Sequence, residues 1–208
     1  MCGRFSLAVN SEDLIQHFQL QTGIFMKPRY NIAPQETVPV LKKLREIEFL
    51  RWGFIPFFKS TTPGETGFIN IRSETVDEKP SFRQALLKGR CLIPASGYYE
   101  WKSVGRAKQP YYIKQKNTAL FALAGLWERD TFGILTVASN SLLIPVHHRM
   151  PVILPLASYA EWMNPKTAVG RIKSLLVPSS SKILEMYPVS PKMNSANFEG
   201  PACIQSLQ

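Results

Sequence analysis

Residues 90–102 read Arg90-Cys91-Leu92-Ile93-Pro94-Ala95-Ser96-Gly97-Tyr98-Tyr99-Glu100-Trp101-Lys102. Two short apolar and aromatic runs, Arg90–Pro94 and Tyr98–Lys102, stand on either side of a turn of small residues. Runs of this length that turn residues bound are typical of β-strands. The stretch therefore predicts two strands in the middle of the chain.

The same pattern continues on both sides of this stretch. Further segments with the length and apolar content of strands are Ile47–Phe54, Tyr111–Lys114, Leu120–Trp127, Gly133–Ala138 and Pro151–Leu154. Helical patterns are fewer. They predict a helix that Ser11 caps and that carries Leu14, Ile15 and Phe18, a helix over Ser81–Lys88 that Gly89 ends, and helices over Ser158–Met163 and Thr167–Leu176.

Strands and helices do not alternate regularly along the chain, which favours the α+β class. We expect a mainly antiparallel, strongly twisted sheet or a partly closed barrel, with flanking helices. The chain has 208 residues, of which 45% are hydrophobic and 19% are charged. This composition is typical of a folded soluble protein, and the length favours a single domain over residues 1–208.

Targeting segments and cysteine content indicate in which compartment of the cell the protein is found. No apolar run reaches the ~18 residues of a membrane span, and the first residues lead directly to Glu12 and Asp13 without an apolar signal core. The cysteines Cys2, Cys91 and Cys203 are odd in number and have no metal-ligand spacing. We therefore expect a cytoplasmic protein with no membrane association and no metal or other cofactor, and nothing in the sequence indicates more than a monomer.

The charge of the chain is strongly basic. Lys and Arg number 25 against 15 Asp and Glu, which gives a formal net charge of +10. An excess of this size points to a polyanionic partner, most often nucleic acid, although many basic proteins bind nothing charged. Because no run of five or more basic residues occurs, folding must assemble any such surface.

Cys2 follows the initiator residue, and its small side chain permits removal of Met1. The new terminus would carry an α-amine, with a pKa of about 7.7–8.0 in unperturbed peptides, beside a thiol. This pair can condense with an aldehyde to an imine and close to a thiazolidine ring. Two other interpretations remain: a hydrolase with an amino-terminal nucleophile, as in class II glutamine amidotransferases, and an ordinary residue near the chain end.

Two segments place polar side chains in apolar surroundings. In Phe68–Glu74, an extended backbone would point Asn70 and Arg72 to one face, where they could orient a substrate and hold a phosphate, or simply face water. Glu100 lies between aromatic residues, so burial would raise its pKa and make it a proton donor. The alternative is an exposed carboxylate paired with Lys102.

Two of the chain's three histidines, His147 and His148, directly precede an apolar strand. A histidine there is suited to general acid or base catalysis near neutral pH. Neighbouring residues seldom share one metal ion and no third ligand is apparent, so a metal site is not expected. The third, His17, lies in the first predicted helix and has a structural role. Arg29–Pro34 is interpreted as a turn-like run.

Taken in order, these segments resemble the SOS-response-associated peptidase family, also called the abasic-site processing proteins. The resemblance covers nearly the whole chain, and the ordered set is far more specific than any single motif. The matching segments are residues 1–5, Arg29–Pro34, Trp52–Pro56, Asn70–Thr75, Phe82-Arg83, Arg90–Pro94, Gly97–Lys102, His147–Pro151 and Val189-Ser190.

The resemblance implies a protein that recognises abasic sites in single-stranded DNA and links to them covalently through Cys2. Asn70 would hold the terminus and the sugar, and Glu100 and His147 would handle protons. The imine would also allow β-elimination of the 3′ phosphate, a lyase activity, and the family name suggests self-removal of Met1. The amidotransferase interpretation and a non-covalent single-strand binding module are the alternatives.

The resemblance also implies a DNA-binding surface. Arg4, Arg72 and Arg149 would contact phosphates, Thr136 would line the site, and Pro34 would support the groove. Phe57 and Phe58 stand where family members often carry Trp. Their rings would stack on bases, while the wedge between bases is tied to Trp in the family; the alternative is that both side chains belong to the core.

Overall fold

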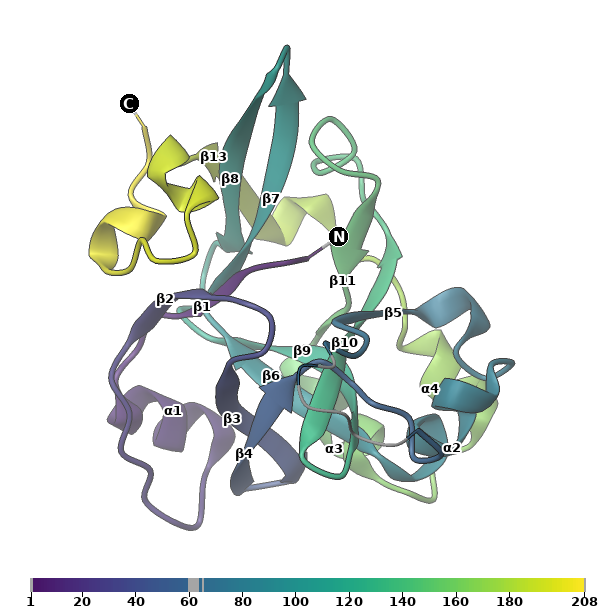
Figure 1. The fold of residues 1–208 in the computed structure, drawn as a ribbon. Coiled ribbons are helices and arrows are strands. Elements are labelled where there is room, and N and C mark those ends of the chain that lie inside the picture. Colours follow the sequence, from purple (N-terminus) through teal and green to yellow (C-terminus); the bar gives the residue numbers. More distant parts are fainter. Residues whose placement is uncertain (1, 60–63, 65, 208) are drawn as a thin grey trace.

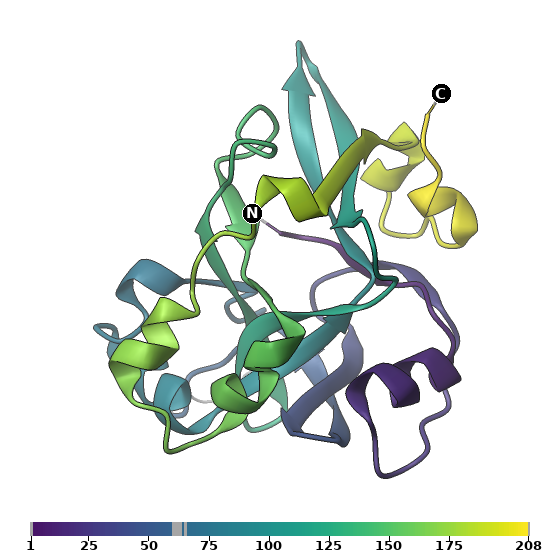
Figure 2. The same cartoon turned by 180° about the vertical axis from the view of Figure 1, so that it is seen from behind.

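The computed structural model describes residues 2–59, 64 and 66–207. Within these residues, helices surround two β-sheets whose strands are mostly antiparallel (Figures 1 and 2). The predicted α+β class is confirmed. The structure shows no helix in this part of the chain with the length and apolar character that a membrane crossing requires.

The first sheet contains the amino-terminal strand. Its order is β13-β8-β7-β1-β2, and all neighbours are antiparallel. Strands β7 and β8 extend beyond the body of the protein as a long hairpin (Figure 1). The bounds are β1 Phe5–Leu7, β2 Arg29–Ile32, β7 Gly97–Val104, β8 Ala107–Gln115 and β13 Leu184–Pro188.

The second sheet forms a ring. The path β10-β4-β3-β6-β9 closes because β9 also pairs with β10, while β11 and β5 add to β10 and β12 adds to β9. Parallel pairing occurs where β10 meets β4 and β5. The bounds are β3 Thr37–Lys43, β4 Glu46–Trp52, β5 Asn70–Arg72, β6 Arg90–Ala95, β9 Phe121–Glu128, β10 Thr131–Ala138, β11 Arg149–Pro151 and β12 Ile153–Leu154.

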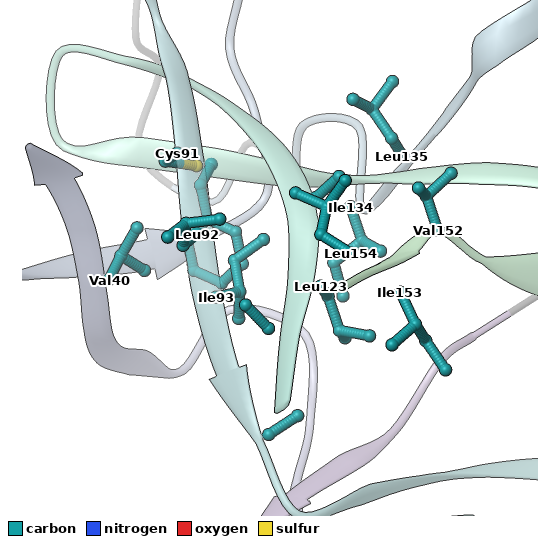
Figure 3. Close-up of a cluster of buried hydrophobic side chains, with 14 of the residues drawn as sticks. Val40, Cys91, Leu92, Ile93, Leu123, Ile134, Leu135, Val152, Ile153 and Leu154 are labelled. Atoms are coloured by element: carbon teal, nitrogen blue, oxygen red, sulfur yellow. The ribbon is translucent and has the colours of Figure 1, made fainter. Parts of the chain in front are cut away.

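The main core fills this ring and the space beneath its helices. Every residue of β6 is buried, and so are the first six of β9, as expected for strands covered on both faces. Figure 3 shows Leu92 and Ile93 packed near Leu123 and Ile134. Gly125 permits this packing, because a Cβ there would stand 2.3 Å from Cδ1 of Ile93.

Short helices cover the sheets. Asn10, and not the predicted Ser11, caps the first helix, since its Oδ1 accepts a hydrogen bond of 2.8 Å from the Asp13 N–H. The α-helices are α1 Ser11–Phe18, α2 Pro80–Lys88, α3 Tyr159–Met163 and α4 Val169–Ser174. The 3₁₀ helices are Ser73–Thr75, Leu156–Ser158, Ser181–Ile183, Pro191–Asn194 and Pro201–Ile204.

Two predicted segments differ from the observed structure. Arg29–Ile32 is the edge strand β2 and not a turn, because it pairs antiparallel with β1. On its outer edge, the Glu199 carboxylate accepts from the backbone N–H groups of Tyr30 and Asn31. The predicted strand Pro151–Leu154 changes partner at Val152: β11 pairs with β10, whereas β12 pairs with β9. The helix predicted over Thr167–Leu176 is shorter, at Val169–Ser174.

A candidate nucleic-acid site beside the amino-terminal strand

Strand β1 holds the start of the chain between β2 and β7. Phe5 pairs with Ile32 on one side and with Tyr98 on the other. Ser6 lies opposite Gly97, and its hydroxyl hydrogen-bonds to the Tyr112 hydroxyl at 2.8 Å. Gly97 makes room for this contact, since a Cβ would stand 2.3 Å from the Tyr112 ring. These contacts fix the position of Cys2, three residues before β1 begins.

Cys2 is fully buried in this chain, which still carries Met1. Its Sγ donates to the Arg4 carbonyl at 3.7 Å, and burial raises the pKa of the thiol far above its ordinary value. The thiol is therefore protonated in this form. Met1 lies outside the described residues, so its predicted removal stays a prediction.

Asn70 reaches the same point from the other sheet. Its Nδ2 donates a hydrogen bond of 2.8 Å to the Cys2 carbonyl, while its buried Oδ1 has no partner among the described residues. Strand β5 places it there by pairing in parallel with β10, where Asn70 lies opposite Ile134 and Arg72 opposite Thr136. The backbone of Cys2 is thus held by both sheets.

Glu100 lies on β7, two residues beyond Tyr98, and is only 2% exposed. Burial raises the pKa of its carboxyl to about 7. The Tyr99 N–H donates to the Arg4 carbonyl at 3.0 Å, so β7 runs beside the start of the chain and carries Glu100 next to this contact. The negative charge of Glu100 helps to raise the pKa of the buried Cys2 thiol, after burial itself. The alternative of an exposed Glu100 paired with Lys102 does not describe this structure.

His147 is half-buried in the segment before β11 and stacks on His148 with ring centroids 4.5 Å apart. Burial lowers its pKa, and the nearby charges of His148 and Arg149 lower it further. Its Nδ1 accepts a hydrogen bond of 3.0 Å from the Arg149 N–H. The same Nδ1 lies 3.2 Å from the Arg149 carbonyl, to which it donates when it carries the proton.

An open groove of about 760 Å³ joins Glu100 to His147. At its edge, the Arg4 guanidinium lies 5.9 Å from the centre of the Trp101 ring and donates to Asn31 Oδ1 at 2.7 Å. The residues that line the groove are Arg4, Glu100, Trp101, Arg106, Ala107, Lys108, His147 and Asn194.

Arg149 and Thr136 are buried beside this region. Arg149 forms a two-pronged ion pair with Glu74, with N–O distances of 2.5 and 2.9 Å, and donates to the carbonyl and hydroxyl of Thr136. Thr136 in turn donates to the Ile71 carbonyl at 3.3 Å. These contacts tie β5, β10 and β11 together. A phosphate contact by Arg149 and a lining role for Thr136 stay predictions, since both side chains are occupied with structural partners.

The other predicted DNA contacts lie on the surface. Arg72 is exposed at the end of β5, and Pro34 is half-buried in the turn after β2. Phe57 and Phe58 are 45% and 56% exposed, so neither belongs to the core, and their rings meet edge to face at 5.3 Å. Arg129 donates to the carbonyls of Phe57 and Lys59 and so supports the segment.

The structure brings Cys2, Asn70 and Glu100 together around the buried start of the chain, and His147 and Arg4 join them through the groove. Sequence reasoning missed Arg106, Lys108 and Asn194 in the groove lining. The short basic segment after Gly105 carried a signal for the first two. No sequence pattern pointed to Asn194, because it reaches the groove from a 3₁₀ helix that is distant in sequence. Among the described residues, no cluster of His, Cys, Asp and Glu could hold a metal ion.

The fold and this site define a protein class. The family model of the SOS response associated peptidase (SRAP) matches residues 1–196, and the chain belongs to this family.

Named relatives extend across bacteria and eukaryotes. The chain is 38% identical over 223 aligned positions to the abasic site processing protein YoqW of Bacillus subtilis (strain 168), covering 99% of this chain and 100% of that protein. It is 31% identical over 252 positions to the abasic site processing protein YMR114C of Saccharomyces cerevisiae, covering 100% of this chain and 68% of that one. A crystal structure of a protein from Bacteroides thetaiotaomicron matches with a TM-score of 0.91 and 29% identity, each chain fully covered.

Proposed function

We propose that this chain processes abasic sites in single-stranded DNA by linking to them covalently through Cys2. The names of its relatives support the class of lesion. The observation that carries the proposal is the arrangement at the start of the chain. Cys2 is held by Asn70 and lies in one buried region with a carboxyl whose pKa is about 7, beside a groove lined by cations.

The chemistry begins with loss of Met1, which frees the α-amine of Cys2. An abasic deoxyribose equilibrates with an open-chain aldehyde at its first carbon. The amine adds to this carbon, and loss of one water molecule gives an imine. The Cys2 sulfur then adds to the imine carbon while the thiol proton passes to nitrogen, which closes a thiazolidine ring without oxidation or reduction. Ring closure is intramolecular and gains from proximity.

Glu100 is suited to the proton transfers in this sequence. With a pKa near 7, its carboxyl is partly protonated at neutral pH, so it can donate a proton as water leaves and accept one as the thiol adds. His147, whose pKa burial lowers, is mainly neutral at the same pH and can serve as a base. Asn70 positions the reacting residue through its carbonyl.

Two side activities belong to the same proposal. The imine acidifies the proton on the neighbouring sugar carbon, and removal of this proton expels the 3′ phosphate, which is an abasic-site lyase reaction. Self-removal of Met1 would be a peptidase reaction at the same residues, as the family's description suggests.

The test is a crosslinking assay. Purified protein with a mass-verified Cys2 terminus is mixed with single-stranded DNA that contains one abasic site, and the products are separated on a denaturing gel. We expect a heat-stable shifted band that Cys2→Ala abolishes. Cys2→Ser retains the amine and should give only a less durable adduct. Cys91→Ala, which removes a buried thiol on β6, is the matched control and should crosslink like the wild type.

A different result would favour another function. Equal binding to intact and abasic DNA, with full release in high salt and no shifted band, would identify a non-covalent single-strand binding protein.

A further inference from the structure

The hairpin β7–β8 carries basic charge that the proposed chemistry does not use. Between Lys102 and Lys108 the chain has three basic residues and no acidic one. Arg106 and Lys108 are exposed, and neither side chain has an ion-pair or hydrogen-bond partner among the described residues. Both nevertheless line the groove that contains Glu100 and His147.

The hairpin is a fixed wall of this groove. Its strands pair up to Val104 and Ala107, and the turn at Gly105 has a φ of 59°, which favours glycine. Its base is fastened to the 3₁₀ helix Pro191–Asn194, since Trp101 Nε1 donates to Asn194 Oδ1 at 2.8 Å. A preformed wall loses little entropy when it binds a ligand.

The opposite wall is the segment before β11, which carries His147 and His148. In Figures 1 and 2 this segment and the hairpin rise on either side of the start of β1. Arg4, Arg106 and Lys108 surround a groove whose one acidic lining residue, Glu100, is buried. Because cations concentrate at the outer part of the groove, its electrostatic field favours an anionic chain there.

The position of the groove determines which part of a bound DNA strand can lie in it. Most of its lining residues belong to the β7–β8 hairpin of the first sheet, whereas Arg72 lies on β5 of the second sheet and the Phe57-Phe58 pair lies in the segment between β4 and β5. In a DNA strand whose damaged sugar is held at Cys2, the nucleotides on one side of the sugar would therefore lie in the groove and those on the other side near β5.

We propose that the hairpin wall binds the phosphodiester backbone on one flank of the damaged sugar, with Arg106 and Lys108 as phosphate contacts. This inference rests on the proposed function, because it takes the sugar to be held at Cys2. Each contact releases counterions from the nucleic acid, so both side chains contribute to the salt dependence of binding.

The experiment measures the dissociation constant at several salt concentrations by fluorescence anisotropy. The ligand is single-stranded DNA with a tetrahydrofuran analogue of the abasic sugar, which has no carbonyl and cannot crosslink. For Arg106→Gln/Lys108→Gln, we expect the slope of log K against log salt to fall by about 1.4, the value for two lost contacts to a single strand. An unchanged slope would overturn the proposal.

The control removes the same charge elsewhere. Lys88 and Lys166 are exposed, have no side-chain partner among the described residues, and belong to the α2 and α3 end of the protein, away from the hairpin (Figure 1). Lys88→Gln/Lys166→Gln should leave the slope unchanged. An equal fall in this variant would show that net charge alone acts and would contradict the assignment.

A second arm tests the restriction to one flank. Two shorter strands carry the analogue at one end, so that nucleotides lie only on its 5′ or only on its 3′ side. Arg106→Gln/Lys108→Gln should weaken the binding of one and spare the other, whereas equal weakening would contradict the groove's placement. Neither arm of this experiment needs crosslinking. If the wild type fails to crosslink but the salt slope and the one-sided weakening are as expected, the proposed function is refuted and the hairpin contact is supported.

Discussion

The buried carboxyl of Glu100 loses its proton near neutral pH. Burial raises its pKa from 4.5, the ordinary value for a glutamate, to about 7. A carboxyl whose pKa is higher in the folded than in the unfolded chain stabilises the protein fully below the unfolded pKa. That contribution is lost as the pH rises through the folded pKa. Glu100 therefore favours folding under mildly acidic conditions and opposes it above neutrality.

The stability of a Glu100→Gln variant should show this directly. The wild type should lose up to about 3 kcal/mol of unfolding free energy relative to the variant between pH 4 and pH 8, because one pKa unit corresponds to about 1.36 kcal/mol. Urea unfolding of both proteins at several pH values gives the difference. A constant difference across this range would mean that the carboxyl is not perturbed in the folded state.

The same variant should slow the proposed reaction. A positioned acid or base contributes about 10²–10⁴ in rate, so Glu100→Gln should reduce the crosslinking rate by this order near pH 7 and remove the pH dependence around that value. Single-turnover crosslinking between pH 5.5 and pH 8.5 measures both. Glu100→Asp should recover part of the rate, and a variant with the wild-type rate and profile would exclude Glu100 from proton transfer.

Strands β5, β10 and β11 carry the candidate site residues Asn70, Arg72, Thr136 and Arg149. Arg149 is the residue that joins them, since its guanidinium bonds both Glu74 and the Thr136 carbonyl. Arg72, on the neighbouring strand β5, is exposed. Arg149 therefore has structural partners that Arg72 lacks, and the phosphate contact that the family resemblance implies for both arginines stays a prediction.

Substitution of the two arginines should separate these roles. Arg149→Met should destabilise the fold by about 2 kcal/mol, because it leaves buried acceptors without a donor while the half-exposed Glu74 can be rehydrated. Arg72→Gln should change stability by less than about 0.5 kcal/mol and weaken DNA binding. Urea midpoints and anisotropy measure the two effects. Equal stability of both variants would show that Arg149 does not stabilise the contact between β5, β10 and β11.

The elements also show what could be predicted from the sequence. Segments rich in apolar residues, such as Leu120–Trp127 and Gly133–Ala138, predicted β9 and β10 within a few residues. Strand β2 was missed because it pairs with β1 and its outer edge is covered by Glu199, and both partners are distant in sequence. The closed ring depends on pairings between remote strands, and no local pattern encodes them.

The candidate site was predicted in part for a similar reason. The aromatic neighbours of Glu100 suggested burial but left an exposed pair with Lys102 open, and the shared face of Asn70 and Arg72 was predicted from alternation along a strand. The bond from Asn70 to Cys2 required both sheets. The burial of Arg149 required Glu74, whose carboxylate matches the guanidinium only after β5, β10 and β11 have paired.

Viewed as a whole, the molecule presents exposed aromatic side chains in separate places. Phe57 and Phe58 form one pair, and Phe25 is 89% exposed in the segment between α1 and β2. Aromatic rings in cationic surroundings can stack on bases, which contributes about 1–3 kcal/mol per base. We expect this role for the pair and not for Phe25.

Alanine substitution tests this assignment. Phe57→Ala/Phe58→Ala should weaken the binding of single-stranded DNA with the carbonyl-free analogue by about 5- to 150-fold, the range for one lost stacking contact. The variant Phe25→Ala removes a more exposed ring and should bind like the wild type. Anisotropy titrations at fixed salt compare the two. Equal affinities for all three proteins would show that the pair does not stack on DNA.

The mass of the intact protein shows whether Cys2 becomes the first residue and whether it forms the proposed adduct. It is measured before and after exposure to single-stranded DNA that holds one abasic site. We expect a free protein lighter by one methionine residue and, after exposure, a species equal to this protein plus the DNA strand minus one water molecule. A protein that retains Met1, or a mature one that gains no such mass, would exclude the thiazolidine crosslink through Cys2.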